Sequence, residues 1–255
     1  MRRLLIIILL LLSFPITSIF AQNTPTTDYQ YQLDQYRRHY AEFKLFQKDY
    51  LNNNTLDNEQ KAVLAAQSTL SARELTMASF VQILKQSIID SRINLPLTIS
   101  TINSLDSLSL SYQQQADAVK LIQTKKDLAN FSQSYQPKLK TNQLILDTAQ
   151  VVNKLAQLMR MEADIEEQSA LLILKLENKR QLVLVQSGLD EVTDFQNKVN
   201  TDFDAIIKQV AQMQANDYYR QDSINQISQN LVLLQDKERR LVERLIDLDT
   251  NYVAF

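Results

Sequence analysis

Apolar side chains recur along the first half of the chain at the spacing of a helix, three or four positions apart. Over residues 28–51, aromatic residues and a leucine alternate at steps of four and three, which places them on one helix face. Over residues 56–91, apolar residues repeat every seven positions. Residues 52–55 read Asn-Asn-Asn-Thr, a composition that ends one helix and caps the next. The pattern therefore predicts helices over 28–51 and 56–91.

Prolines mark the breaks expected further along the chain. Pro96 and Pro137 each precede an apolar, helix-spaced stretch, and proline is tolerated in the first turn of a helix. The sequence predicts a third helix within 97–135 and a fourth from about 137 to 187.

Residues 170–188 contain two apolar runs, 171–174 and 182–185, on either side of a charged stretch. One interpretation keeps the whole segment helical and buried in a bundle. The other makes it two short strands joined at 177–180, or a helical hairpin, in either case an apolar tongue. In the tongue interpretation, the residues expected to contact a membrane are Leu172, Ile173, Val183 and Val185.

The most regular pattern lies in residues 188–255, where two rows of apolar residues each repeat every seven positions. One row contains Val192, Val199, Ile206, Met213, Ile227, Leu234, Leu241 and Leu248. The other row contains Phe203, Val210, Ile224, Leu231, Leu245 and Tyr252. A sustained seven-residue repeat is typical of a left-handed coiled coil. We expect a long coiled-coil helix over 188–255.

Polar residues interrupt these rows at Asp217, Arg220 and Glu238. Asp217 and Arg220 either fix the register of one long helix or mark a hinge where the chain bends or reverses. The apolar positions of the rows either bind a partner or form a core within the chain. The candidate interface residues are Ile224, Ile227, Leu231, Leu234, Leu241 and Leu245.

The N-terminus has the pattern of a secretory signal peptide. Arg2 and Arg3 precede nine unbroken apolar residues, 4–12, and a small residue, Ala21, precedes the expected cleavage site. The alternative is an uncleaved signal anchor over 1–21. We expect the rest of the chain to be exported, to a periplasm, a cell surface or the medium, with 22–27 as a linker.

Composition narrows the chemistry that this chain can perform. With one glycine, one histidine and no cysteine among 255 residues, it lacks glycine-rich phosphate loops, paired imidazoles and thiolate ligands. A net charge of −2 disfavours nucleic-acid binding. We therefore expect no catalytic, cofactor-binding or metal-binding residues. The one histidine, His39, is expected to lie beside the aromatic helix face, and the acidic run 162–167 on a solvated face.

Together these features predict an all-α, elongated helical bundle over 28–187 with a long C-terminal coiled-coil helix. The expected function is a non-enzymatic structural or interaction protein of the cell envelope, which binds itself or another helical protein. The alternative is a secreted, membrane-active, pore-former-like protein that uses the tongue around 171–185. A third hypothesis is a periplasmic holdase that binds clients on the aromatic face of residues 29–50. Membrane contact through the N-terminal segment is expected only if that segment is not cleaved.

Overall fold

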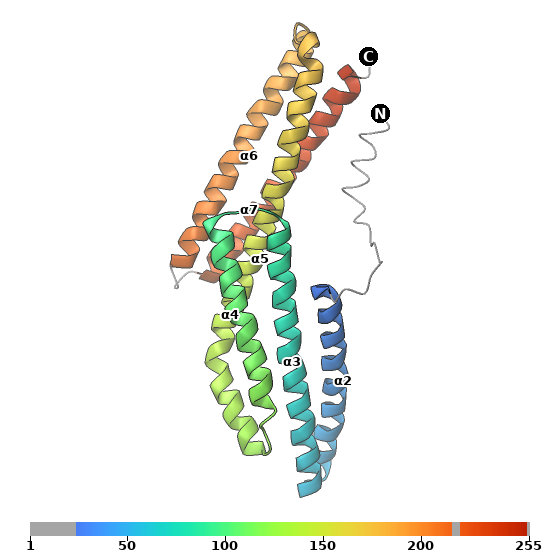
Figure 1. The fold of residues 1–255 in the computed structure, drawn as a ribbon, viewed down its shortest axis with the longest axis vertical. Helices are drawn as coiled ribbons and strands as arrows, with labels where there is room; N and C mark the ends of the chain where they lie inside the picture. Colours follow the sequence, from blue (N-terminus) through green and yellow to red (C-terminus); the bar gives the residue numbers. More distant parts are fainter. Residues whose placement is uncertain (1–23, 216–219, 254–255) are drawn as a thin grey trace. The chain divides into compact units, whose positions relative to one another are not determined.

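The computed structural model describes residues 24–215 and 220–253, and its regular structure over these residues is helical throughout. The predicted all-α fold is confirmed. The helices, drawn in Figure 1, are α2 (Pro25–Asn52), α3 (Leu56–Asp90), α4 (Pro96–Val119), α5 (Lys125–Leu176), α6 (Val183–Ala215) and α7 (Arg220–Leu248), with a final π-helical turn at Asp249–Val253.

The chain forms two compact units, each built from its own packed helices. The N-terminal unit spans Asn23–Ala156, and the C-terminal unit contains the described residues from Gln157 onward. Helix α5 contributes its first part to the N-terminal unit and its last part to the C-terminal unit.

The ends of α2 and α3 are set by threonine caps. The Thr24 hydroxyl accepts a hydrogen bond from the backbone N–H of Thr27 (3.3 Å), and Thr55 caps α3 in the same way. The helix predicted over 56–91 is confirmed to within one residue. The helix predicted over 28–51 begins earlier, at Pro25, because proline suits the first helical position after a cap. The last three residues of the expected linker are therefore helical.

Helices α2 and α3 pack antiparallel, with aromatic residues facing small ones. The buried residues of α3 include many alanines, threonines and serines, whereas the half-buried face of α2 carries the aromatic residues. The Thr69 hydroxyl of α3 donates to the backbone carbonyl of His39 in α2 (2.9 Å), which requires the helix backbones to approach closely. The Tyr29 and Phe80 rings lie 5.9 Å apart between their centroids, within the range for aromatic contact.

Helix α4 and the first part of α5 complete the N-terminal unit. Lys85 of α3 pairs with Asp106 of α4 (2.6 Å), and Gln82 donates to Ser109 (2.9 Å), so α3 and α4 are antiparallel. Figure 1 shows α2, α3 and α4 running side by side. The core of this unit includes Leu105, which is fully buried.

The expected helix break at Pro137 is wrong, because Pro137 lies inside α5. The helix begins twelve residues earlier, at Lys125. There the Asp127 carboxylate accepts from the backbone N–H of Thr124 (2.9 Å), and the Thr124 hydroxyl accepts from that of Asp127 (3.1 Å). This reciprocal cap fixes the helix start. Burial of apolar residues such as Leu146 offsets the cost of a proline in the helix interior.

Residues 170–188 form a helical hairpin, one of the alternatives that the sequence left open. Helix α5 ends at Leu176, a 3₁₀ turn occupies Glu177–Lys179, and α6 begins at Val183. No strand occurs here or elsewhere in the described ranges. Asn200 of α6 donates to Glu166 of α5 (3.2 Å), and Ser169 of α5 donates to Gln196 of α6 (3.5 Å), so the two helices run antiparallel.

The seven-residue rows of 188–255 belong to two helices, α6 and α7, where the pattern predicted one long helix. Glu191, early in α6, pairs with Arg244, late in α7 (2.6 Å), and Gln209, late in α6, accepts from Asn230, early in α7 (3.0 Å), so the helices are antiparallel. The rows therefore pack against each other within the chain. Asp217, the expected hinge or register residue, lies outside the described residues.

Gly188 lies inside α6, at its contact with the end of α7. A Cβ atom at this position would lie 2.5 Å from Cδ2 of Leu248, whose side chain is buried. Absence of a side chain at Gly188 thus allows α7 to pack closely on α6.

Candidate functional site

The six candidate interface residues lie in or at the edge of the interior of the C-terminal unit. Five of them are at most 6% exposed, and Leu245 is half-buried against the same core. In this structure they form an intramolecular core, the second of the two roles that the sequence left open. The buried five are Ile224, Ile227, Leu231, Leu234 and Leu241.

The four candidate membrane-contact residues are divided between interior and surface. Leu172 and Val185 are buried in the core of the hairpin, and Ile173 is half-buried against it. Val183 is 81% exposed. The structure therefore separates residues that the sequence grouped together.

A cluster of exposed apolar side chains nevertheless lies around the connection between α5 and α6. We call it the apolar end. Two of its residues precede the connection and are three positions apart, so they share one helix face. The others begin α6 or directly precede it, and all five are between 46% and 81% exposed. The apolar end consists of Leu171, Leu174, Leu182, Val183 and Leu184.

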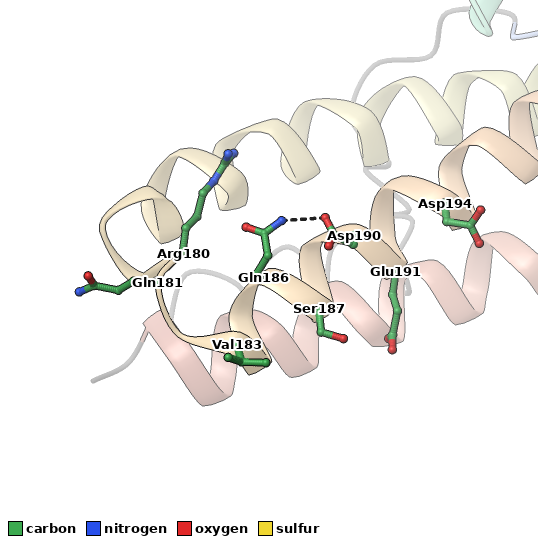
Figure 2. Close-up of a pocket in the computed structure, with 8 residues that line it drawn as sticks. All are labelled: Arg180, Gln181, Val183, Gln186, Ser187, Asp190, Glu191 and Asp194. Carbon is green, nitrogen blue, oxygen red and sulfur yellow. Dashed lines mark hydrogen bonds between the residues drawn. The ribbon is translucent and has the colours of Figure 1, made fainter.

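A shallow groove of about 630 Å³ runs from the apolar end along α6. Figure 2 shows its residues: Val183 and Arg180 lie at the turn, and the carboxylates of Asp190, Glu191 and Asp194 follow along α6. The groove lining thus carries three carboxylates and one guanidinium group.

Two lysines at the apolar end contact the π-helical turn, Asp249–Val253, that follows α7. Lys179 donates from Nζ to the backbone carbonyl of Tyr252 (2.5 Å), and Lys175 Nζ lies 3.7 Å from Asp249 Oδ1. Arg180 pairs with Glu177 within the turn (3.3 Å). These contacts hold the exposed leucines and valine on an anchored hairpin, which favours a preformed binding surface.

The described residues offer few candidates for a metal site or for a pair of catalytic bases. His39 is half-buried on α2, with Nδ1 3.7 Å from Glu42 Oε2. In the described part of the chain, no group of three acidic or histidine side chains is placed to hold a metal ion. Within the same residues, no helix has both the length and the apolar character needed to span a membrane.

The expectation that the acidic run 162–167 is solvated is wrong for one of its members. Glu162 is 4% exposed, whereas Asp164, Glu166 and Glu167 are exposed. Glu162 occupies the same seven-residue row as Leu155 and Leu176, which are both buried. Extending that row through α5 would have identified Glu162 as a core residue from the sequence.

Three buried carboxylates have raised pKa values. Burial raises the pKa of Glu74 in α3, against the opposing effect of its contacts with Arg73 and Tyr135. Burial, with the charge of Glu166, raises the pKa of Glu162 to about 7. Burial, with the charge of Glu162, raises the pKa of Glu238 to about 8.

Comparison of the chain with protein-family models, with curated proteins and with solved structures finds no match in any of the three.

Proposed function

We propose that this protein is an exported, non-enzymatic interaction protein of the cell envelope, which binds a helical protein partner through the apolar end. The observation that carries the proposal is the exposure of Leu171, Leu174, Leu182, Val183 and Leu184 around one connection. Clustered exposed apolar residues with a polar surround are typical of interaction sites. The N-terminal pattern of a signal peptide supports export.

The charges beside the apolar end favour a protein partner of particular chemistry. Asp190, Glu191 and Asp194 line the adjoining groove, with Arg180 as its one cation. Carboxylates disfavour approach to an anionic lipid surface and favour basic groups on a partner. The proposed ligand is therefore an amphipathic helix, from a second copy or another protein, with lysine or arginine beside its apolar face.

The absence of cysteine allows a site-specific test. A photo-crosslinker attached to Val183→Cys on the apolar end should give a discrete protein adduct in intact cell envelopes. Leu45→Cys is a matched control, because Leu45 is 65% exposed on α2 and belongs to the N-terminal unit. Adding Leu174→Glu to Val183→Cys should abolish the adduct. Equal labelling from positions 183 and 45 would overturn the proposal.

Experiments with the purified chain distinguish a second copy from a membrane as the binding partner. If the partner is a second copy, the purified chain crosslinks to itself from position 183, and light scattering shows a dimer that Val183→Glu dissociates. If the chain instead acts on membranes, it releases dye from liposomes, and Val183→Glu abolishes the release. That second result would replace the proposed function with the membrane-active alternative.

A further inference from the structure

Two carboxylates face the interior of the C-terminal unit without partners. Glu162 of α5 is 4% exposed and Glu238 of α7 is fully buried. Among the described residues, no group donates a hydrogen bond to any of their four carboxylate oxygens. An ionised carboxylate in such a place is strongly unfavourable, so each group needs either a counter-charge or a proton.

The two carboxylates lie at the same level of the three-helix packing. Hydrogen bonds from Asn200 to Glu166 (3.2 Å) and from Lys237 to Asp202 (2.5 Å) place residues 199–203 of α6 beside both helices at this level. Both side chains are buried at this level, Glu162 on α5 and Glu238 on α7. The carboxylates therefore form one buried pair across α5 and α7.

No counter-charge comes from α6. Its buried residues at this level are Val199 and Phe203, which are apolar. Of the charged α6 residues nearby, Lys198 pairs with Asp194 (2.6 Å), Asp202 pairs with Lys237, and Asp204 is exposed and carries a negative charge, which supplies no counter-charge.

The neighbouring charges on α5 and α7 do not neutralise the pair either. On α5, Arg160 pairs with Asp164 (3.1 Å), and the negative charge of Glu166 acts against ionisation of Glu162. On α7, Arg239 pairs with Asp236 (3.6 Å). Because two carboxylates alone are too few ligands for a metal, protons are the species that neutralise them.

We propose that Glu162 and Glu238 form a proton-dependent lock, which keeps α7 packed against α5 and α6 while protonated and loosens α7 when the protons are lost. Both groups hold protons in the folded chain at pH values where the unfolded chain, with an ordinary pKa of 4.5, has lost them. Stability therefore falls as pH rises above about 4.5, and the loss is complete above about pH 8.

Amide hydrogen exchange on the full exported chain tests the lock. After correction for intrinsic exchange rates, protection of α7 peptides should fall at least about 10-fold between pH 5 and pH 8. The double variant Glu162→Gln, Glu238→Gln cannot titrate and should show no such fall. The control Glu243→Gln changes an exposed glutamate of α7 and should keep the fall. Equal pH dependence in the wild type and the double variant would overturn the proposal.

A second test of the lock uses the wild-type protein, so that its result does not depend on whether the variants fold. Carbon-13 labelling of glutamate side-chain carboxyls should reveal two signals that titrate near neutral pH in the wild-type protein. Each signal should disappear in one of the single variants, Glu162→Gln or Glu238→Gln. If the signals of Glu162 and Glu238 both titrate near pH 4.5, the lock does not exist.

Discussion

The two units of this chain bury carboxylates in opposite ways. In the N-terminal unit, Glu74 is fully buried but held by Arg73, at 2.5 Å and 3.0 Å, and by the Tyr135 hydroxyl at 3.4 Å. The Arg73 guanidinium also lies 4.7 Å from the centre of the Tyr135 ring. In the C-terminal unit, Glu162 and Glu238 receive no such contact.

This difference predicts that buried carboxylates affect the stability of the two units differently. A charge with partners specifies how helices align, and removing a partner leaves it uncompensated. A carboxylate without partners makes the fold depend on protonation instead. We therefore expect substitutions at corresponding places in the two units to act with opposite signs.

The largest effect is expected from removing the partner of Glu74. Arg73→Met should destabilise the N-terminal unit by about 3 kcal/mol, near the low end for broken buried pairs because the Arg73 side chain is 35% exposed. Urea unfolding followed by circular dichroism measures this, with hydrogen exchange in α3 to assign the transition. The double variant Arg73→Met, Glu74→Leu should recover most of the loss. If Arg73→Met lowers the free energy of unfolding by less than about 0.5 kcal/mol, the contacts between Arg73 and Glu74 stabilise the unit no more than a solvent-exposed ion pair does.

The opposite sign is expected for Glu238. Glu238→Leu should stabilise the C-terminal unit by about 2 kcal/mol at pH 8, because it removes a buried charge and restores the apolar row. At pH 4.5 the gain should be much smaller, since the carboxyl is then protonated. Thermal unfolding at the two pH values gives the comparison. Destabilisation at pH 8 would show that Glu238 has a compensating contact in solution.

A smaller effect is expected where the helices of the C-terminal unit approach most closely. Gly188→Ala should cost about 1–2 kcal/mol, because the new methyl group overlaps with buried Leu248 and outweighs alanine's better helix propensity. Urea unfolding of the single and double variants forms a cycle with Leu248→Ala. In the Leu248→Ala background, Gly188→Ala should become neutral or stabilising, whereas an unchanged cost would locate the strain elsewhere.

The smallest effect is expected at the start of α5 in the N-terminal unit. Thr124→Ala removes the hydroxyl that accepts from the Asp127 backbone and should cost about 1 kcal/mol. Thr124→Ser keeps an equivalent oxygen and should cost less. Hydrogen exchange of the first turn of α5 reports the local loss, and an unchanged rate in Thr124→Ala would contradict this role of the cap.

The sequence predicted the helices where local signals and packing agree. The ends of α3 follow from the Thr55 cap and an uninterrupted apolar repeat, both visible in the residues themselves. The sequence wrongly predicted a helix start at Pro137. Proline locally favours the first turn of a helix, but burial of apolar residues on both sides of Pro137 outweighs this preference, and α5 continues through it. The helical hairpin at the break between α5 and α6 was one of the alternatives that the sequence left open. Only the packing of the two flanking segments determines that both are helical.

The candidate site was less predictable than the fold. The run 171–174 is uniformly apolar, yet Leu172 points into the core while Leu171 and Leu174 are exposed. Which residues of such a run remain exposed depends on where α6 and α7 pack, and the local pattern does not contain that information. Burial of Glu162 was not predicted because it belongs to a run of acidic residues, and such a run is expected to be exposed to solvent. Glu162 nevertheless occupies the same seven-residue row as buried leucines of α5.

The antiparallel pairing of α2 with α3, α3 with α4, and α6 with α7 has a consequence for how the chain reaches its native state. Each pair is consecutive in sequence, and the connections before α3 and α4 are only three and five residues long, 53–55 and 91–95. Contacts between near neighbours in sequence require little loop-closure entropy, so folding is expected on the order of microseconds to milliseconds. Each of these helices can then pair with the next helix as soon as that helix has been synthesised. Helix α2 needs only the next helix, α3, to cover its aromatic face.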